Sequence, residues 1–253
     1  MSVVKTLERT KRATFSVLVP HPNPEYKGLP SPNGTGFFVS GSGFFITARH
    51  VLWRDKLGTI LHSPTDISLE KPEEFGGFVK NFSLVKEWRE HDLVLLKADF
   101  EQNKLMESLK GKSGFDFLDI DFEVIPEGTD VYSFGYPLPE SEVVGNENLT
   151  VGLINFYPRA TSAIVSSHHD VLGPVQIDVG FPRYYVIDKA LNYGNSGGPI
   201  VVNETGRAFS VCIKFQPVDI PQRIGVVSVP SLYGVAVSLK NIEEDLRTLV
   251  GIH

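Results

Sequence analysis

Tyr-Gly-Asn-Ser-Gly-Gly-Pro, at Tyr193–Pro199, is the most informative stretch of this chain, because it places a serine hydroxyl inside a glycine-rich turn. Glycine tolerates sharp backbone bends, so Gly194 and Gly197–Gly198 let the chain fold tightly around Ser196. Such a turn also brings backbone N–H groups close to a carbonyl under attack by the hydroxyl. A serine hydroxyl is a weak nucleophile by itself, so this interpretation requires a general base and a carboxylate elsewhere in the chain.

Candidates for both roles lie upstream of Ser196, each at the edge of an apolar run. His50 ends the segment Thr47–His50, and Asp92 begins the run Asp-Leu-Val-Leu-Leu. An imidazole suits the role of general base because its ordinary pKa of about 6.5 lies close to neutral pH. A carboxylate at Asp92 is suited to hold the imidazole tautomer and to stabilise its protonated form. A plain strand start is the alternative interpretation of Asp92.

The composition favours a protein of many short strands. The chain has 253 residues, of which 42% are hydrophobic, so it can bury a large core without disulfides. Its 17 phenylalanines, 23 glycines and 17 prolines favour strands and turns over long helices. The net charge of -6 gives no electrostatic reason to expect a nucleic-acid partner.

Cysteine usage and the N-terminus bear on location. Cys212 is the single cysteine, so an intramolecular disulfide is impossible, which fits a reducing compartment. We interpret it as a small core residue, with a redox role as the alternative. Met1–Arg12 is polar and lacks the apolar core of a signal peptide. No apolar stretch approaches the roughly 18–20 residues of a membrane span. We therefore expect a cytoplasmic protein with no membrane partner.

Apolar runs of strand length recur along the chain and predict strands. They are Thr14–Val19, Gly36–Val39, Gly43–Thr47, Leu93–Ala98, Val131–Phe134, Tyr184–Ile187, Pro199–Val202, Phe209–Phe215 and Gly234–Val237. Turn-rich segments separate them, among them His21–Pro32 and the acidic Pro137–Asn148.

One convincing helix is predicted near the C-terminus, over residues 239–250, with Ser238 as its N-cap and Glu243–Asp245 facing outward. A shorter helix around Asn103–Lys110 is a further candidate. The acidic stretch Asp119–Asp130 is the best candidate linker. It divides a single unit, 1–253, into an N-terminal β-barrel at 14–122, a C-terminal β-barrel at 129–238 and the helix.

Five segments resemble the chymotrypsin-like (trypsin-fold) serine proteases, and more closely their disulfide-free Deg-type, high-temperature-requirement branch. They are Thr35–Ser40 with Gly43–Leu52, Asp92–Lys97, Phe134–Pro137, Ile187–Ser196 and Gly234–Ser238. His50, Asp92 and Ser196 also follow in the order of the chymotrypsin-type triad. The resemblance implies an all-β fold of two antiparallel six-stranded β-barrels with a C-terminal α-helix and the site in the cleft between the barrels. Because the chain ends after the helix, we expect no PDZ domain of the kind that usually follows in this branch.

The function that this resemblance implies is a serine endopeptidase. Ser196 would attack a peptide carbonyl after passing its proton to His50, with Asp92 supporting the imidazole. The N–H groups of Gly194 and Ser196 would form the oxyanion hole. We expect a protein or peptide substrate and neither cofactor nor metal, while a regulatory partner and self-association stay open. The alternative is a protease-fold binding or scaffold protein whose site is held in an inactive conformation.

The resemblance also assigns a substrate-binding set: Ala190, Lys214, Phe215 and Gly234. Ala190 corresponds to the base of the pocket for the residue before the scissile bond, and it offers no charge for arginine or lysine. The strand Val211–Phe215 resembles the one that pairs with substrate backbone. We therefore expect a small or medium apolar residue at that substrate position, and not trypsin-like specificity.

Asn195 departs from the zymogen-activated digestive enzymes, in which an aspartate precedes the serine and pairs with a newly cut N-terminus. We therefore predict no activation by N-terminal cleavage. Other candidate groups have structural interpretations. His91 faces the opposite side of the strand from Asp92, and Asp188 holds a loop. The cluster His168–Asp170 fits a solvated loop better than a metal site.

Overall fold

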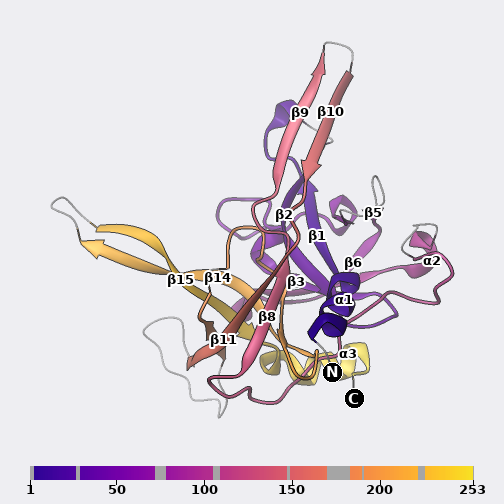
Figure 1. Cartoon of the computed structure of the whole chain (residues 1–253). Coiled ribbons are helices and arrows are strands. Elements are labelled where there is room, and N and C mark those ends of the chain that lie inside the picture. Colours follow the sequence, from indigo (N-terminus) through magenta and orange to yellow (C-terminus); the bar gives the residue numbers. More distant parts are fainter. Residues whose placement is uncertain are drawn as a thin grey trace.

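The computed structural model describes residues 3–26, 29–71, 78–104, 109–146, 149–169, 183–189, 191–221 and 226–252. Antiparallel strands dominate this part of the chain (Figure 1). The N-terminal sheet contains β1 (Thr14–Pro20), β2 (Pro30–Phe38), β3 (Phe44–Ala48), β4 (Ser68–Glu70), β5 (Phe78–Val79), β6 (Phe82–Trp88) and β7 (Leu93–Ala98). The C-terminal sheet contains β8 (Asp130–Gly135), β11 (Arg159–His169), β12 (Tyr184–Ile187), β13 (Pro199–Val202), β14 (Ala208–Pro221) and β15 (Val226–Ser238).

The two sheets differ in closure. The C-terminal strands form a closed barrel in the order β11-β12-β15-β14-β13-β8, as expected. The N-terminal strands follow the order β5-β4-β1-β2-β3-β7-β6, and their ladder ends at β5 and β6 within the described residues. The expected six strands are therefore joined by a seventh, the two-residue β5. The all-β class and the C-terminal helix are confirmed.

Strand pairing in the N-terminal sheet brings the first two site candidates together. β3 pairs with β7 so that Ala48, at the end of β3, lies opposite Leu93, at the start of β7. His50 follows Ala48 in a 3₁₀ turn at Arg49–Leu52, and Asp92 immediately precedes Leu93. Both strands are almost wholly buried, as expected for runs of β-branched and aliphatic residues.

The hairpin β13–β14 positions Ser196, the third site candidate, at one end of the closed barrel. The Gly197 N–H donates to the Cys212 carbonyl at 2.7 Å, and the Cys212 N–H donates to the Gly198 carbonyl at 2.9 Å. These two bonds extend the β13–β14 ladder up to the residue after Ser196. The serine therefore stands at the end of a rigid strand.

Two hairpins extend away from the sheets (Figure 1). One consists of β9 (Glu140–Asn146) and β10 (Leu149–Asn155), paired in register from Leu149–Asn146 to Asn155–Glu140. The acidic segment at Pro137–Asn148 was expected to be turn-rich, and for Glu140–Asn146 that expectation is wrong, because cross-strand backbone bonds stabilise these residues as a strand despite their poor β-propensity. The other is the outer part of β14–β15, which stays paired as far as Pro221 and Val226.

Helix α1 (Val3–Ala13) was not predicted. Its buried side is polar, which conceals it from a search for apolar periodicity. The Thr10 hydroxyl lies 2.8 Å from the Tyr132 hydroxyl on β8, and Arg9 forms an ion pair with Asp119 at 2.8 Å. The helix therefore joins the start of the N-terminal sheet to the C-terminal barrel.

The C-terminal segment 239–250 begins as a 3₁₀ turn, Leu239–Ile242, and continues as α3 (Glu243–Val250). The Ser238 hydroxyl accepts from the Lys240 N–H, as an N-cap does. Asp245 was expected to face outward. Instead its carboxylate accepts hydrogen bonds from the Trp88 indole at 2.6 Å and from Lys86 at 2.7 Å, so it ties the helix to β6.

A short helix, α2 (Phe100–Asn103), ends at the first residue of the second helix candidate, Asn103–Lys110, whose residues 105–108 lie outside the described residues. The predicted unit boundaries at 122 and 129 stay predictions. Residues 119–129 lie outside helices and strands, apart from a single bridge between Ile120 and Ala208. In the described part of the chain, none of the helices has the length and apolar character needed to cross a bilayer.

Candidate active site

The predicted triad residues line one cavity of about 640 Å³ between the two sheets. His50 and Asp92 come from the N-terminal sheet, and Ser196 comes from the turn before β13. The other lining residues are Pro32, Asn33, Trp53, Leu138, Pro139, Leu191, Asn192, Tyr193, Gly194, Ile213 and Lys214. The structure therefore gathers four predicted site residues besides Ser196 itself: His50, Asp92, Gly194 and Lys214.

Asp92 holds the His50 ring by two contacts. Its Oδ2 lies 2.5 Å from Nδ1 of His50, and its Oδ1 accepts the backbone N–H of His50 at 2.9 Å. Asp92 adopts a left-handed conformation with φ of 54° at the end of the turn Arg89–His91, which aims its side chain back at the histidine. A carboxylate accepts the Nδ1 proton, so the neutral ring keeps Nε2 free as a base.

The turn before Ser196 is a type II turn. The Asn195 N–H donates to the Asn192 carbonyl at 3.0 Å, and Gly194 has φ of +93°, the conformation that this turn requires at its third residue. A Cβ atom on Gly194 would lie 2.3 Å from the Tyr136 carbonyl oxygen, so only glycine fits.

The turn also orients the predicted oxyanion donors. The Leu138 N–H donates to the Tyr193 carbonyl at 2.7 Å, which directs the Gly194 N–H of the same trans peptide to the opposite side. Within the residues that the structure describes, neither the Gly194 N–H nor the Ser196 N–H has a protein acceptor. Two backbone donors next to the serine are therefore available to an oxyanion.

The Ser196 hydroxyl contacts a backbone carbonyl of β14 and not the His50 ring. It donates to the Ile213 carbonyl at 3.5 Å, a long hydrogen bond. Among the described residues it has no hydrogen bond with His50. The structure thus joins His50 to Asp92 and places Ser196 in their cavity without joining it to the imidazole.

Sequence reasoning missed Thr35, which anchors the nucleophile turn to β2. Its hydroxyl donates to the Gly194 carbonyl at 2.6 Å and its N–H donates to the Ser196 carbonyl at 2.8 Å. The only local signal was its position at the start of an apolar strand. Its partners lie in another part of the sequence, so no pattern around residue 35 indicates them.

The predicted substrate-binding residues have different outcomes. Lys214 lines the cavity, and Phe215 lies opposite Gly234 in the β14–β15 ladder. Ala190 lies outside the described residues. A Cβ atom on Gly234 would lie 2.4 Å from the Leu191 side chain, so Leu191, which was not predicted, occupies the space above this glycine.

The groups with structural interpretations are placed as follows. His91 is buried, and burial lowers the pKa of its imidazole. Asp188 accepts the Ile164 N–H at 2.8 Å, which ties the loop before the nucleophile to β11. Cys212 is buried, and burial raises the pKa of its thiol. The His168 Nε2 contacts the Ile125 carbonyl at 2.7 Å, and Asp170 lies outside the described residues. Among described residues, no three His, Cys, Asp or Glu side chains are arranged to hold a metal.

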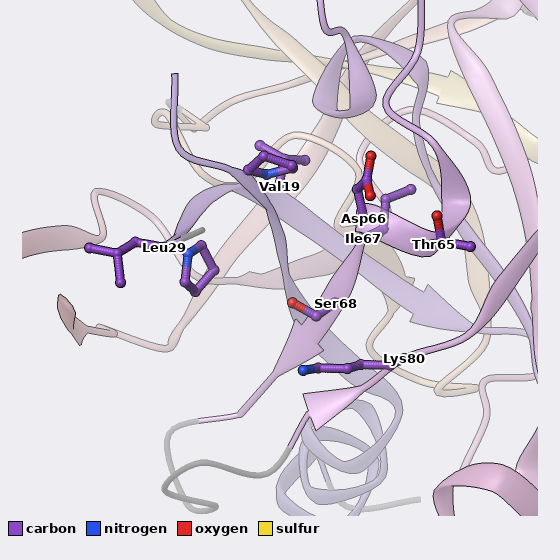
Figure 2. Close-up of a pocket in the computed structure, with 9 residues that line it drawn as sticks. Val19, Leu29, Thr65, Asp66, Ile67, Ser68 and Lys80 are labelled. Atoms are coloured by element: carbon purple, nitrogen blue, oxygen red, sulfur yellow. The ribbon is translucent and has the colours of Figure 1, made fainter. Parts of the chain in front are cut away.

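A second cavity, of about 310 Å³, lies on the N-terminal sheet and contains none of the predicted site residues. Figure 2 shows its lining, in which Val19, Leu29 and Ile67 supply apolar surface beside the charged Asp66 and Lys80. Thr65 and Ser68 carry its hydroxyl groups. Among the described residues of this lining there is no histidine that could activate them.

The fold is that of the chymotrypsin-like β proteins, and the chain belongs to the trypsin-like peptidase family. The model of the trypsin-like peptidase domain matches residues 34–211, more than half of the chain. The mitochondrial serine protease HTRA2 of Drosophila erecta is 26% identical over 188 residues, which cover 74% of this chain and 36% of that protein. The same protein of Drosophila ananassae is 25% identical over the same length. The chain thus spans about a third of the length of these curated relatives.

Solved structures support the same fold. A serine endoprotease from Yersinia pestis matches with a TM-score of 0.60 and 17% identity, covering 99% of this chain and 67% of that one. The HtrA-type protease AlgW, solved with a decapeptide, matches with a TM-score of 0.61 and 17% identity, covering 99% and 68%. The expected resemblance to the high-temperature-requirement branch is confirmed.

Proposed function

We propose that this chain is a serine endopeptidase that uses Ser196 as nucleophile, His50 as general base and Asp92 as the group that orients the imidazole. One observation carries the proposal. The His50–Asp92 pair, at 2.5 Å, shares a cavity with a serine whose turn offers two N–H groups without protein acceptors. Base, nucleophile and oxyanion donors are the parts that acyl transfer requires.

The chemistry begins with a rotation of the Ser196 side chain. Its hydroxyl turns from the Ile213 carbonyl towards Nε2 of His50, a change between staggered rotamers. The long 3.5 Å bond to Ile213 offers little resistance to this movement. The oxygen then attacks the peptide carbonyl while His50 takes the proton, and Asp92 stabilises the resulting imidazolium.

The carbonyl oxygen becomes negatively charged in the tetrahedral intermediate, and the N–H groups of Gly194 and Ser196 donate hydrogen bonds to it. One such donor contributes about 3–4 kcal/mol to the transition state in related chemistry. His50 next gives its proton to the leaving nitrogen, which releases the amine product first and leaves an acyl-enzyme; water then hydrolyses the ester, which releases the acid product and restores the Ser196 hydroxyl.

The cavity supports a small or medium apolar side chain before the scissile bond. Leu191 fills the space above Gly234, so the pocket is shallow on that side. Of the described lining residues, Asp92 is the only acidic one, and it is engaged by His50. Lys214 adds a positive charge. These features disfavour a substrate arginine or lysine.

No cut N-terminus is needed for activation in this proposal. Asn195 is buried, and the turn around it is closed by backbone hydrogen bonds to Asn192 and from Gly198. A neutral amide there requires no incoming ammonium group, whereas a buried carboxylate would. Mass determination of the active protein tests this, and activity that appears only after cleavage near residues 10–16 would refute it.

A fluorophosphonate probe, which phosphonylates activated serines, tests the proposal directly. The wild-type protein should be labelled and should cleave a denatured protein substrate. Ser196→Ala should abolish both, because losing a triad serine costs on the order of 10⁶ in kcat. Ser42→Ala, at an exposed serine in the turn between β2 and β3, is the matched control and should leave labelling unchanged.

The rotation of Ser196 towards Ile213 favours one alternative, a protease-fold binding protein with an inactive site. Such a protein would bind peptides equally well as wild type and as Ser196→Ala, and neither form would react with the probe. Absence of labelling, together with retained peptide binding, would establish the alternative.

Protein or peptide substrates are the partners that this chemistry implies. A cytoplasmic location stays a prediction, and the curated relatives are named as mitochondrial proteins. Fractionation of cells that express the tagged chain tests it, with recovery in an organelle fraction as the contradicting outcome.

A further inference from the structure

Trp53 presents an exposed aromatic ring inside the candidate active site. Its side chain is 40% exposed and lines the cavity that contains His50 and Ser196. The indole and imidazole rings meet edge to face, with centroids 5.9 Å apart. Among the described residues, no group accepts a hydrogen bond from the indole N–H. An exposed ring with an available N–H is suited to contact a ligand.

The loop that carries Trp53, residues 53–61, is closed by its own hydrogen bonds. Trp53 and Leu61 form an antiparallel bridge, and the Arg54 N–H donates to the Ile60 carbonyl at 2.9 Å. Asp55 accepts the Ile60 N–H and the Thr59 hydroxyl, each at 2.7 Å. These bonds, led by the one from Ile60, lower the pKa of the Asp55 carboxyl to about 2.

A buried arginine fixes this loop relative to the base. Arg49, the residue before His50, donates from Nη1 to the Gly58 carbonyl at 2.5 Å and forms an ion pair with Glu87 on β6. Gly58 lies beneath the indole, since a Cβ atom there would be 2.7 Å from Cε2 of Trp53. The Trp53 ring is therefore held near His50 by Gly58, which packs against the indole, and by Arg49, which bonds to the Gly58 carbonyl.

The remaining lining residues indicate which part of a substrate reaches Trp53. Leu191, Ile213 and Lys214 line the same cavity from the β14 side, where the proposed function places the acyl part of the substrate. His50 gives its proton to the leaving nitrogen, so the residue carrying that nitrogen passes beside the imidazole and its neighbour Trp53.

A second apolar group lies near the oxyanion turn. Leu138 and Tyr193 are 50% and 70% exposed, and both line the cavity. The backbone bond between them fixes their separation. Exposed apolar side chains from loops of both halves of the chain thus line the same cavity as His50 and Ser196.

We propose that Trp53 forms an apolar subsite for the side chain that follows the scissile bond, so that the enzyme prefers proteins with a large apolar residue on the leaving side. This inference rests on the proposed endopeptidase function. It assigns a specificity-determining role to a residue outside the triad and the oxyanion hole.

Partitioning of the acyl-enzyme tests this subsite alone. The enzyme is acylated with N-acetyl-valine p-nitrophenyl ester, and leucinamide and glycinamide compete as acceptors of the acyl group. Ser196 takes the acyl group, and the phenolic oxygen of the ester leaves as p-nitrophenol. The amine of the acceptor then attacks the acyl-enzyme, forms the new amide bond and regenerates the Ser196 hydroxyl. The ratio of the two amide products measures preference on the leaving side, independently of the acyl group.

Wild type should favour leucinamide, and Trp53→Ala should reduce that preference about fivefold to tenfold, the effect of losing one partly buried apolar contact. Trp53→Phe keeps a ring and should lose less. Leu57→Ala is the matched control, because Leu57 is 86% exposed on the same loop and does not line the cavity. It should behave as wild type.

An unchanged product ratio in Trp53→Ala, with normal fluorophosphonate labelling, would overturn this inference and leave the proposed function intact. A change confined to the choice of acyl group would overturn it as well. Failure of the probe to label wild type would overturn the proposed function and the subsite with it.

Discussion

The hydroxyl of Thr35 donates a 2.6 Å hydrogen bond to the carbonyl of Gly194, and this bond joins the N-terminal sheet to the turn that carries Ser196. The same hydroxyl accepts the Tyr136 N–H at 3.2 Å. Thr35 is fully buried, so no water replaces these partners. The conformation of the oxyanion turn therefore depends on a strand of the opposite sheet.

Thr35→Val should impair catalysis while preserving the shape of the side chain. It removes the hydrogen bond to the Gly194 carbonyl and the one from the Tyr136 N–H, which costs about 1–3 kcal/mol of stability. We also expect kcat to fall about tenfold, because the oxyanion donors lose their support. Urea unfolding and the rate of fluorophosphonate labelling measure the two effects. Thr35→Ser keeps the hydroxyl and should retain most of the rate; equal rates for the valine and wild-type proteins would contradict this role.

Asp92→Asn should nearly abolish activity without unfolding the protein. Asparagine tolerates the left-handed conformation found at residue 92 and can still accept the His50 backbone N–H. Its amide stabilises the wrong imidazole tautomer, which costs about 10⁴ in kcat in the chymotrypsin triad. Initial rates on a peptide substrate, with circular dichroism as the folding control, measure this. A loss below tenfold in a folded variant would show that Asp92 is not the orienting carboxylate.

Glu70, at the end of β4, should make stability depend on pH near neutrality. Burial raises the pKa of its carboxyl to about 7 from an ordinary value of 4.5. The folded protein thus holds a proton that the unfolded chain releases, so the stability contribution is complete below about pH 4.5 and is lost as pH rises through 7. Because the side chain is partly exposed, we expect a change on the order of 1–2 kcal/mol.

Glu70→Gln isolates this effect. At pH 8 the free energy of unfolding of the variant should exceed that of wild type by about 1–2 kcal/mol, and near pH 4.5 the two values should be equal. Urea unfolding of both proteins across this range measures it. Parallel stability curves for the two proteins would contradict the assignment.

Asp245→Ala should loosen the C-terminal helix. The substitution leaves the buried Trp88 indole N–H without its acceptor and removes the Lys86 ion pair, at a cost of about 1–2 kcal/mol. Asp245→Asn keeps an acceptor for Trp88 and should cost about half as much. Urea unfolding followed by Trp fluorescence measures both.

The same carboxylate predicts acid sensitivity. The hydrogen bonds from Lys86 and then Trp88 lower the pKa of Asp245, so its contribution is present above the unfolded pKa and is lost as pH falls through the folded value. The difference in the free energy of unfolding between wild type and Asp245→Ala should therefore decrease below about pH 4. A difference in unfolding free energy that does not change with pH would contradict a stabilising role for the ionised Asp245 carboxylate.

Local features of the chain were predictable because they depend on neighbouring residues. Apolar runs such as Leu93–Ala98 and Tyr184–Ile187 became strands with the same bounds. The glycines around Ser196 predicted a tight turn, and Gly194 has a positive φ that other residues rarely adopt. The order of His50, Asp92 and Ser196 also indicated the family without any spatial information.

Other features depended on contacts that no local pattern encodes. Helix α1 buries threonines against Tyr132, which lies more than a hundred residues away, so its sequence lacks an apolar stripe. The segment Glu140–Asn146 became a strand because β10 supplies its backbone partners. Leu191 filled the space above Gly234 only once β12 and β15 were paired.

The chain alone specified the strands that its apolar runs form, its glycine turn and the chemical types of its site residues, since these follow from φ preference and apolar alternation. The assembled fold decided which groups of the site are in contact. Asp92 bonds to the His50 ring, Thr35 donates to the Gly194 carbonyl, the Trp53 ring contacts the His50 ring, and the Ser196 hydroxyl donates to the Ile213 carbonyl. Each of these is a contact between groups whose distance is set by strand register and packing, and register is a property of paired strands rather than of either strand by itself.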